Sequence, residues 1–197
     1  MKRTLALLAL ATLAVASQAQ TFNTVSFANT LGATANFVAS GNSYTANLSG
    51  FNLTANNPIG DLAWVFDFDS NPVPAFTAVR IDIGGRLGGG SVIDGIGSEK
   101  VFDMSSTPVE VANGLVEFTV TNGGVNDLLF NYSATYTFSQ PVTMGQAQKD
   151  LLFILTGGGN SFARIDYVRQ EFTPVPEPAT MAVVGLGVAA LIRRRRR

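Results

Sequence analysis

The sequence predicts an all-β fold: an antiparallel β-sandwich, jelly-roll-like, with about ten strands. An N-terminal signal helix and a C-terminal membrane helix are expected on either side of it. Three observations predict the sandwich. Apolar and polar residues alternate over short segments, these segments are rich in aromatic and β-branched residues, and turn residues, including many of the 20 glycines, separate them. No segment between residues 20 and 173 is convincing as a helix.

The clearest strand covers residues 79–83, where the charged residues Arg80 and Asp82 alternate with three apolar residues. Residues 62–68 alternate in the same way, and the uninterrupted apolar run 151–155 is typical of a central strand. In chain order the expected strands cover residues 22–28, 35–39, 44–53, 62–68, 79–83, 92–96, 101–103, 116–120, 128–138, 151–155 and 162–172. Their order within the sheets stays open.

A glycine-dense segment follows one of these strands at residues 84–90. A phosphate-binding loop would need a Lys-Ser or Lys-Thr pair after it and a helix to lend its N-terminus. The sequence has neither, so we expect a surface loop.

The first 19 residues have the composition of a signal peptide. Lys2 and Arg3 precede an apolar run over residues 4–16, and small residues follow it. Cleavage is expected between Ala19 and Gln20, with cleavage after Ala16 as the alternative. An uncleaved anchor is the other interpretation, but the run is shorter than the roughly 20 residues that span a bilayer.

The last 24 residues form a second targeting segment. A Pro-rich linker at 174–178 precedes an uncharged stretch at 179–192, which we expect to be a short transmembrane helix. A helix of this length reaches about 21 Å, against about 30 Å of hydrocarbon. A buried core helix is the alternative, but five arginines directly follow the segment. These should stay cytoplasmic and stop transfer: Arg193, Arg194, Arg195, Arg196 and Arg197.

The residues Val175, Pro176, Glu177 and Pro178, followed by a short apolar helix and an arginine cluster, resemble the PEP-CTERM sorting signal. The resemblance implies processing by a signal peptidase and an exosortase. It also implies secretion through the inner membrane, transient anchoring there, and a final place in the cell envelope or outside the cell, with exopolysaccharide as a further partner. The same tail is sometimes labelled an ice-binding protein C-terminal domain, a name that describes the tail alone.

Composition excludes several functions for the exported domain, residues 20–173. It holds six basic and 13 acidic residues, a net charge of −7, which disfavours nucleic-acid binding. Because the chain has no Cys and no His, it lacks the usual zinc ligands and the commonest general base. We therefore expect no cofactor.

A weak calcium candidate lies at Asp67, Asp69 and Asn71, whose oxygens alternate as in calcium loops. The loop lacks the glycine and the bidentate glutamate that such sites use. We therefore prefer the interpretation that both aspartates face solvent at the end of a strand.

Catalysis is not expected. Glycosidases use two convergent carboxylates, and the acidic residues closest in sequence show no sign of converging. These are Glu99, Asp103, Glu110 and Glu117. The two lysines of the exported domain, Lys100 and Lys149, belong to no recognisable catalytic motif.

Aromatic side chains offer a possible sugar-binding platform. The candidates are Tyr44, Trp64, Tyr132, Tyr136 and Tyr167. Trp64 is expected in the core, and Tyr132 and Tyr136 on the inner face of a strand. The sequence thus predicts an exported structural or adhesive protein without catalysis. The alternatives are a carbohydrate-binding module of the envelope or biofilm matrix and, less favoured, a glycan-acting enzyme.

Overall fold

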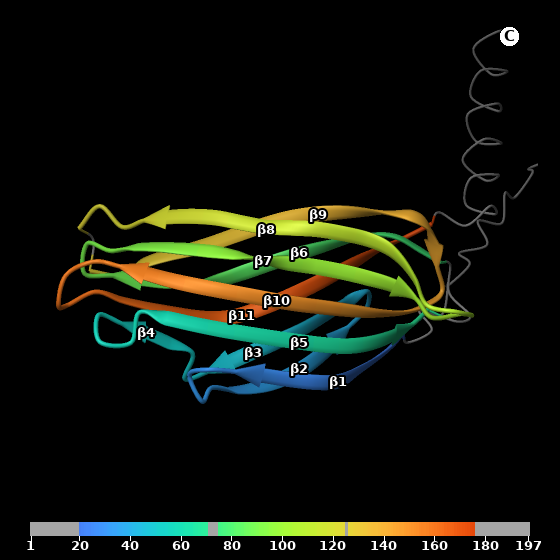
Figure 1. Ribbon diagram of the computed structural model, residues 1–197, viewed down its shortest axis with the longest axis horizontal. Helices are drawn as coiled ribbons and strands as arrows, with labels where there is room; N and C mark the ends of the chain where they lie inside the picture. Colours follow the sequence, from blue (N-terminus) through green and yellow to red (C-terminus); the bar gives the residue numbers. More distant parts are fainter. Residues whose placement is uncertain (1–19, 71–74, 125, 176–197) are drawn as a thin grey trace, which may run out of the picture.

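The computed structural model describes residues 20–70, 75–124 and 126–175, which form two antiparallel sheets that face each other (Figure 1). The first is the five-stranded sheet, in the order β1 (Thr21–Asn29), β5 (Ile59–Asp69), β10 (Met144–Thr156), β7 (Val92–Asp103) and β8 (Val109–Thr121). The second is the six-stranded sheet, in the order β2 (Thr34–Ser40), β3 (Ser43–Ser49), β11 (Phe162–Pro174), β6 (Phe76–Gly88) and β9 (Leu128–Val142), with β4 (Asn52–Thr54) paired to β11.

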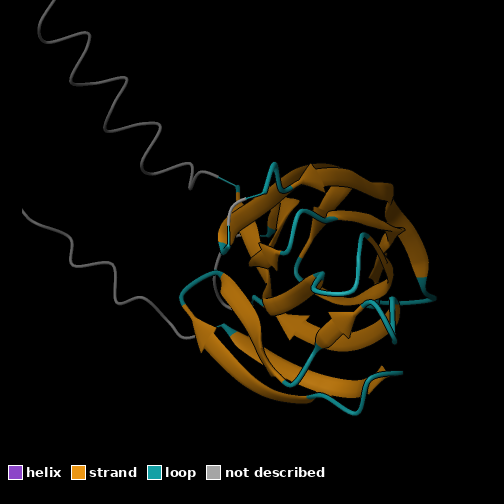
Figure 2. Cartoon of the chain, turned by 90° about the vertical axis from the view of Figure 1, so that its left-hand side faces the viewer, coloured by secondary structure: helices purple, strands orange, loops and turns teal. Residues whose placement is uncertain are grey.

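Seen along the strands, the two sheets curve around a shared interior (Figure 2). Strands from distant parts of the chain are neighbours in both layers: β10 lies between β5 and β7, and β11 lies between β3 and β6. All regular structure in the described residues is β-strand, so the predicted all-β sandwich is confirmed.

The core consists of side chains that alternate inward from both sheets. In β5 the predicted alternation holds, since Leu62, Trp64, Phe66 and Phe68 are at most 2% exposed. The Trp64 ring centroid lies 4.7 Å from that of Phe66 and 5.3 Å from that of Tyr44 on the opposite sheet. Full burial of such side chains contributes about 1.5–3 kcal/mol each, so this aromatic layer accounts for a large part of the attraction between the sheets.

Several strands are longer than the sequence pattern predicts. The expected strands 92–96 and 101–103 form the single strand β7, and the expected strand 44–53 divides into β3 and β4. The run 151–155 is only the second half of β10, which begins at Met144.

The glycine-dense segment was expected to be a loop, and this expectation is wrong for its first half. Gly84, Gly85 and Gly88 lie within β6. Neighbouring atoms occupy the space where their side chains would be: the Tyr167 ring at Gly84, the Arg164 carbonyl at Gly85 and the Phe162 ring at Gly88. The glycines therefore serve close packing between β6 and β11, whereas Gly89 and Gly90, with φ of 76° and 65°, form the turn.

The signal peptide, with Ala19, lies outside the described residues, and so does the tail after Val175. That tail holds the sorting residues Pro176, Glu177 and Pro178 and the expected helix 179–192 with the five arginines after it. Pro174, expected in the linker, instead ends β11. At the boundaries, Gln20 Nε2 donates to Asn42 Oδ1, and Val175 N donates to Ala75 O. Within 20–70, 75–124 and 126–175, no helix has the length and apolar character needed to cross a membrane.

Candidate functional site

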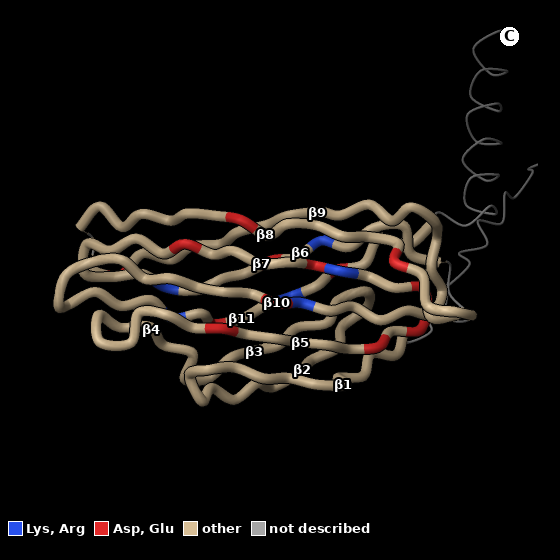
Figure 3. The backbone as a smooth tube through the Cα atoms, viewed as in Figure 1, with Lys and Arg blue, Asp and Glu red and all other residues tan. Residues whose placement is uncertain are grey.

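The outward side of the six-stranded sheet carries a polar surface that we call the arginine face. All six basic residues of the described part lie within strands rather than in turns (Figure 3), and four of them are arginines of β6 and β11. The arginine face consists of Arg80, Asp82, Gly84, Arg86, Arg164, Asp166, Tyr167, Arg169 and Glu171 on these two strands, with Ser43 on β3, Asp127 before β9 and Ser133 on β9.

Strand alternation places most of these side chains outward, and a register shift in β11 between Ile165 and Tyr167 lets the consecutive residues Asp166 and Tyr167 both face out. In β6, Val79, Ile81 and Ile83 are fully buried in the core, so the residues between them, Arg80 and Asp82, point away from it. The antiparallel register then sets Asp82 beside Arg169 of β11 and Ser133 of β9. Residues far apart in the chain thus meet in one row across the sheet.

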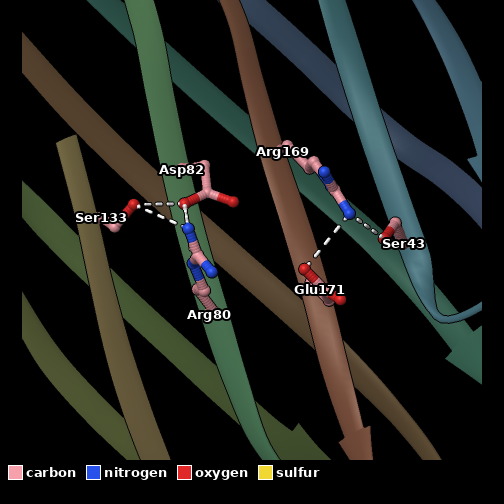
Figure 4. Close-up of polar contacts among 6 residues, drawn as sticks. All are labelled: Ser43, Arg80, Asp82, Ser133, Arg169 and Glu171. Atoms are coloured by element: carbon pink, nitrogen blue, oxygen red, sulfur yellow. Dashed lines mark hydrogen bonds and ion pairs between the residues drawn. The ribbon is translucent and has the colours of Figure 1, made fainter. Parts of the chain in front are cut away.

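Two groups of polar contacts occupy the middle of the face (Figure 4). In one, Arg80 Nη2 lies 2.8 Å from Asp82 Oδ1 and donates to Ser133 Oγ at 3.1 Å, while Ser133 Oγ also donates to Asp82 Oδ1. In the other, Arg169 Nη2 donates to Ser43 Oγ at 2.9 Å and to Glu171 Oε2 at 3.2 Å. Side chains on neighbouring strands therefore hold both guanidinium groups in place.

A third group lies further along the same two strands. Arg86 Nη1 lies 2.5 Å from Asp127 Oδ2, and Arg164 Nε lies 2.5 Å from Asp166 Oδ1. The contact with Asp166 raises the pKa of Arg164. Each arginine of the face thus has a carboxylate partner, so the face is close to neutral even though the exported domain is acidic.

Tyr167 lies in the same surface, between the arginine pairs. Its ring rests against the backbone of β6, because a Cβ added to Gly84 would lie 2.4 Å from ring atoms Cε1 and Cζ. The Tyr167 side chain is partly exposed. The ring is therefore an aromatic platform on the sheet, supported by a glycine and flanked by hydrogen-bond donors and acceptors.

The other aromatic candidates belong to the interior. Trp64 is fully buried, as predicted, and Tyr44 is 5% exposed. Tyr132 and Tyr136 are partly buried and pack against the core, and the Tyr136 hydroxyl donates to the Leu115 carbonyl. Of the five candidates, Tyr167 is the one whose ring lies on the outward side of a sheet and does not pack against the core.

The calcium candidate has the geometry of a strand surface. Asp67 and Asp69 are alternate residues of β5, partly exposed on its outward side, and Asp67 Oδ1 accepts a hydrogen bond from Gln146 Nε2 at 2.9 Å. Asn71 lies outside the described residues. Among residues 20–70, 75–124 and 126–175, no three acidic side chains are grouped as metal ligands would be.

The four carboxylates considered for catalysis do not share an environment. Glu99 is fully buried, whereas Glu110 and Glu117 are exposed on β8. Asp103 Oδ1 accepts from the Ser105 backbone N–H and Oδ2 accepts from Gln140, and these bonds lower the pKa of Asp103. These contacts fix the end of a strand and form no paired-carboxylate site.

A cluster that the sequence analysis missed lies between the two sheets. Glu99 of β7 and Lys149 of β10 are register partners whose side chains both point inward, with Lys149 Nζ 3.5 Å from Glu99 Oε2. Gln170 of β11 donates from Nε2 to Glu99 Oε1. Burial raises the pKa of Glu99 and lowers that of Lys149 to about 8. Taking a charge into a protein interior costs several kcal/mol per ion, even after relaxation. Burial of this charged pair therefore carries a desolvation penalty that opposes folding.

The outward side of the five-stranded sheet differs from the arginine face. It has a shallow depression of about 340 Å³ lined by Ile96, Gly97, Ser98, Leu115, Asp150 and Leu152. Three of these are exposed apolar side chains, at 45% for Ile96, 63% for Leu115 and 36% for Leu152. One side of the sandwich is thus polar and ordered by ion pairs, and the other is mainly apolar at this depression.

Fold and surface together define an antiparallel β-sandwich whose six-stranded sheet carries a polar, ion-paired outward face. Residues 174–197 match the PEP-CTERM protein-sorting motif, which confirms the resemblance noted from the tail. The chain therefore ends in a PEP-CTERM sorting motif, which supports export and sorting through an exosortase.

Comparison with curated proteins finds no match. Among solved structures, the tailspike protein 4 enzymatically active domain of bacteriophage CBA120 is similar at 9% identity and a TM-score of 0.30, with 80% of this chain and 20% of that one covered. A xylan-binding domain from Paenibacillus barcinonensis matches at 9% identity and a TM-score of 0.30, covering 79% and 95%. A family 11 carbohydrate-binding module from Clostridium thermocellum also matches at 9% and 0.30, covering 79% and 97%. Likenesses at this level do not assign a function.

Proposed function

We propose that the protein is a non-catalytic adhesive component of the cell envelope or extracellular matrix, and that it binds neutral polysaccharide through the arginine face. The observation that carries this proposal is the Tyr167 ring, which packs against Gly84 between arginine–carboxylate pairs. A sugar ring has an apolar side that stacks on an aromatic ring and hydroxyl groups that need donors and acceptors. The arginine face offers both within one surface.

The charge balance of the face favours a neutral ligand. Its four arginines are paired with Asp82, Asp127, Asp166 and Glu171, so little positive charge remains to attract an anionic polymer. Arg80 and Arg169 are still 47% and 41% exposed, so further N–H groups can reach a ligand. Hydrogen bonds from charged donors contribute about 1.5–3 kcal/mol each when made.

The absence of catalysis is part of the proposal. Hydrolysis of a glycosidic bond uses two carboxylates that flank the substrate. On the arginine face each carboxylate is engaged by an arginine, and the unusual carboxylate, Glu99, is buried between the sheets. These contacts support binding in place of bond cleavage.

The test is the affinity of the full-length protein for neutral and anionic polysaccharides, measured by affinity electrophoresis or calorimetry. Tyr167→Ala should weaken binding to a neutral polysaccharide about tenfold if the ring contributes about 1.4 kcal/mol. Leu115→Ala, on the outward side of the other sheet, is the matched control and should bind like wild type. Binding that is equal in wild type and Tyr167→Ala, or that occurs only with anionic polymers, would contradict the proposal.

A further inference from the structure

The interior cluster of Glu99, Lys149 and Gln170 joins the two sheets through a single carboxylate. Lys149 and Glu99 come from the five-stranded sheet and Gln170 from the six-stranded sheet, and all three side chains are buried. Glu99 Oε1 contacts the amide nitrogen of Gln170, while Oε2 lies 3.5 Å from Lys149 Nζ. An amine and a carboxamide are thus held on the two oxygens of the same group.

The noncovalent contacts leave this cluster incomplete. Lys149 Nζ, Glu99 Oε2 and Gln170 Oε1 are buried atoms that have no hydrogen-bond partner among the described residues. Buried polar atoms are nearly always hydrogen-bonded, and each exception requires an explanation. Here three exceptions occur in one contact group.

The surroundings favour the neutral, reactive forms of the pair. Lys149 Nζ lies 4.7 Å from the centroid of the Trp64 ring and 4.5 Å from that of Phe66. This apolar environment raises the pKa of Glu99 and lowers that of Lys149, so a proton can pass from the ammonium to the carboxylate. A desolvated lysine amine is a nucleophile, and an adjacent carboxylic acid can transfer protons.

We propose that Lys149 and Gln170 form an intramolecular isopeptide bond, with Glu99 relaying the protons. Lys149 first gives a proton to Glu99, and the free amine attacks Cδ of Gln170. The Nζ–Cδ bond forms and the Cδ–Nε2 bond breaks. Glu99 delivers its proton to Nε2, takes another from Nζ, and Nε2 leaves as ammonia. The step needs no oxidant, reductant or cofactor.

The product resolves the incomplete contacts. The ammonium becomes an amide N–H, and the protonated Glu99 can donate to the carbonyl oxygen that lacks a partner in the noncovalent cluster. The bond joins β10 to β11, and therefore one sheet to the other, in a chain that has no cysteine for a disulfide. A covalent link across the core would hold the two sheets together in the adhesive role proposed above.

Peptide mapping by mass spectrometry tests the proposal on the folded full-length chain, purified in detergent and then digested with trypsin. The expected product is a branched peptide that joins residues 101–164, uncut after Lys149, to the peptide that begins at Gln170. Its mass should be the sum of the two minus one ammonia. Separate peptides 101–149 and 150–164 in the fully folded protein would overturn the proposal.

Two variants identify the roles within the cluster. Glu99→Gln should leave the chain uncross-linked, whereas Lys100→Arg, which changes the adjacent lysine on the outward side of β7, should keep the link. A link that persists in Glu99→Gln would overturn the proton relay. Loss of one water with Lys149 joined to Glu99 would overturn the choice of Gln170.

Discussion

The contact between Gly84 and Tyr167 gives the most specific prediction for the arginine face. In Gly84→Ala, the new Cβ would lie 2.4 Å from Cε1 and Cζ of the Tyr167 ring. Carbon atoms in contact are about 3.5–4.0 Å apart, so the ring must move outward by roughly 1 Å or more. Because Tyr167 is partly exposed, the ring can move without displacing core residues.

The expected consequence is a loss of binding with little change in stability. Glycine within a strand costs about 0.5–1 kcal/mol relative to alanine, which offsets part of the strain from moving the ring. We therefore expect the free energy of unfolding to change by less than about 1 kcal/mol. Losing the stacked position of the ring should cost about 0.5–1.5 kcal/mol of binding energy, which weakens polysaccharide binding about two- to tenfold.

Calorimetric titration with a neutral polysaccharide and urea unfolding measure the two quantities. Gly158→Ala is the matched control, since the same change there meets no atom within 4 Å and needs no positive φ. Unchanged affinity in Gly84→Ala, or a fall equal to that of Gly158→Ala, would show that the supported ring takes no part in binding.

Three further predictions address the core, the charges and the tail. Trp64→Ala removes a fully buried side chain and should lower the free energy of unfolding by about 3–5 kcal/mol, and a loss below about 1 kcal/mol in urea titration would refute its core role. Arg169→Met should weaken polysaccharide binding while changing stability by less than about 1 kcal/mol, because exposed ion pairs contribute little. Lys100→Met is its control, and equal affinities in both variants would exclude Arg169 from the binding face. Neutral replacements across Arg193–Arg197 should reduce retention in the inner membrane, and unchanged fractionation would contradict the stop-transfer role.

The fold class follows from local pattern, but the length of the strands does not. Alternation in residues 62–68 and 79–83 directly indicates strands with one apolar face. Glycine usually interrupts strands, so residues 84–90 resemble a loop in sequence. Gly84 lies within a strand because the Tyr167 ring occupies the space of a side chain there. Tyr167 belongs to β11, the last strand in the sequence, so no local pattern reveals this contact.

The binding face and the interior cluster depend on register between distant strands. Tyr167 was one of five aromatic candidates, and only its pairing with Gly84 distinguishes it from the others. Lys149 carries a weak clue in the sequence, because it has the same strand parity as Ala147, Leu151 and Phe153, which are buried. Its partners Glu99 and Gln170 lie on β7 and β11. No local sequence pattern shows which strands lie next to these two.

The sorting tail, in contrast, could be predicted because its recognition depends on no contact between distant strands. A processing enzyme recognises a short linear segment, so residue order and spacing carry the information without any tertiary contact. Residues 174–197 match the sorting motif on that basis.

The most direct test of the account is the mass-spectrometric determination of both termini of the mature protein recovered from the cells that make it. The mature protein should begin at Gln20 and end close to Pro176, Glu177 and Pro178, with Arg193–Arg197 removed. A protein recovered outside the cell that still ends at Arg197 would contradict export through an exosortase.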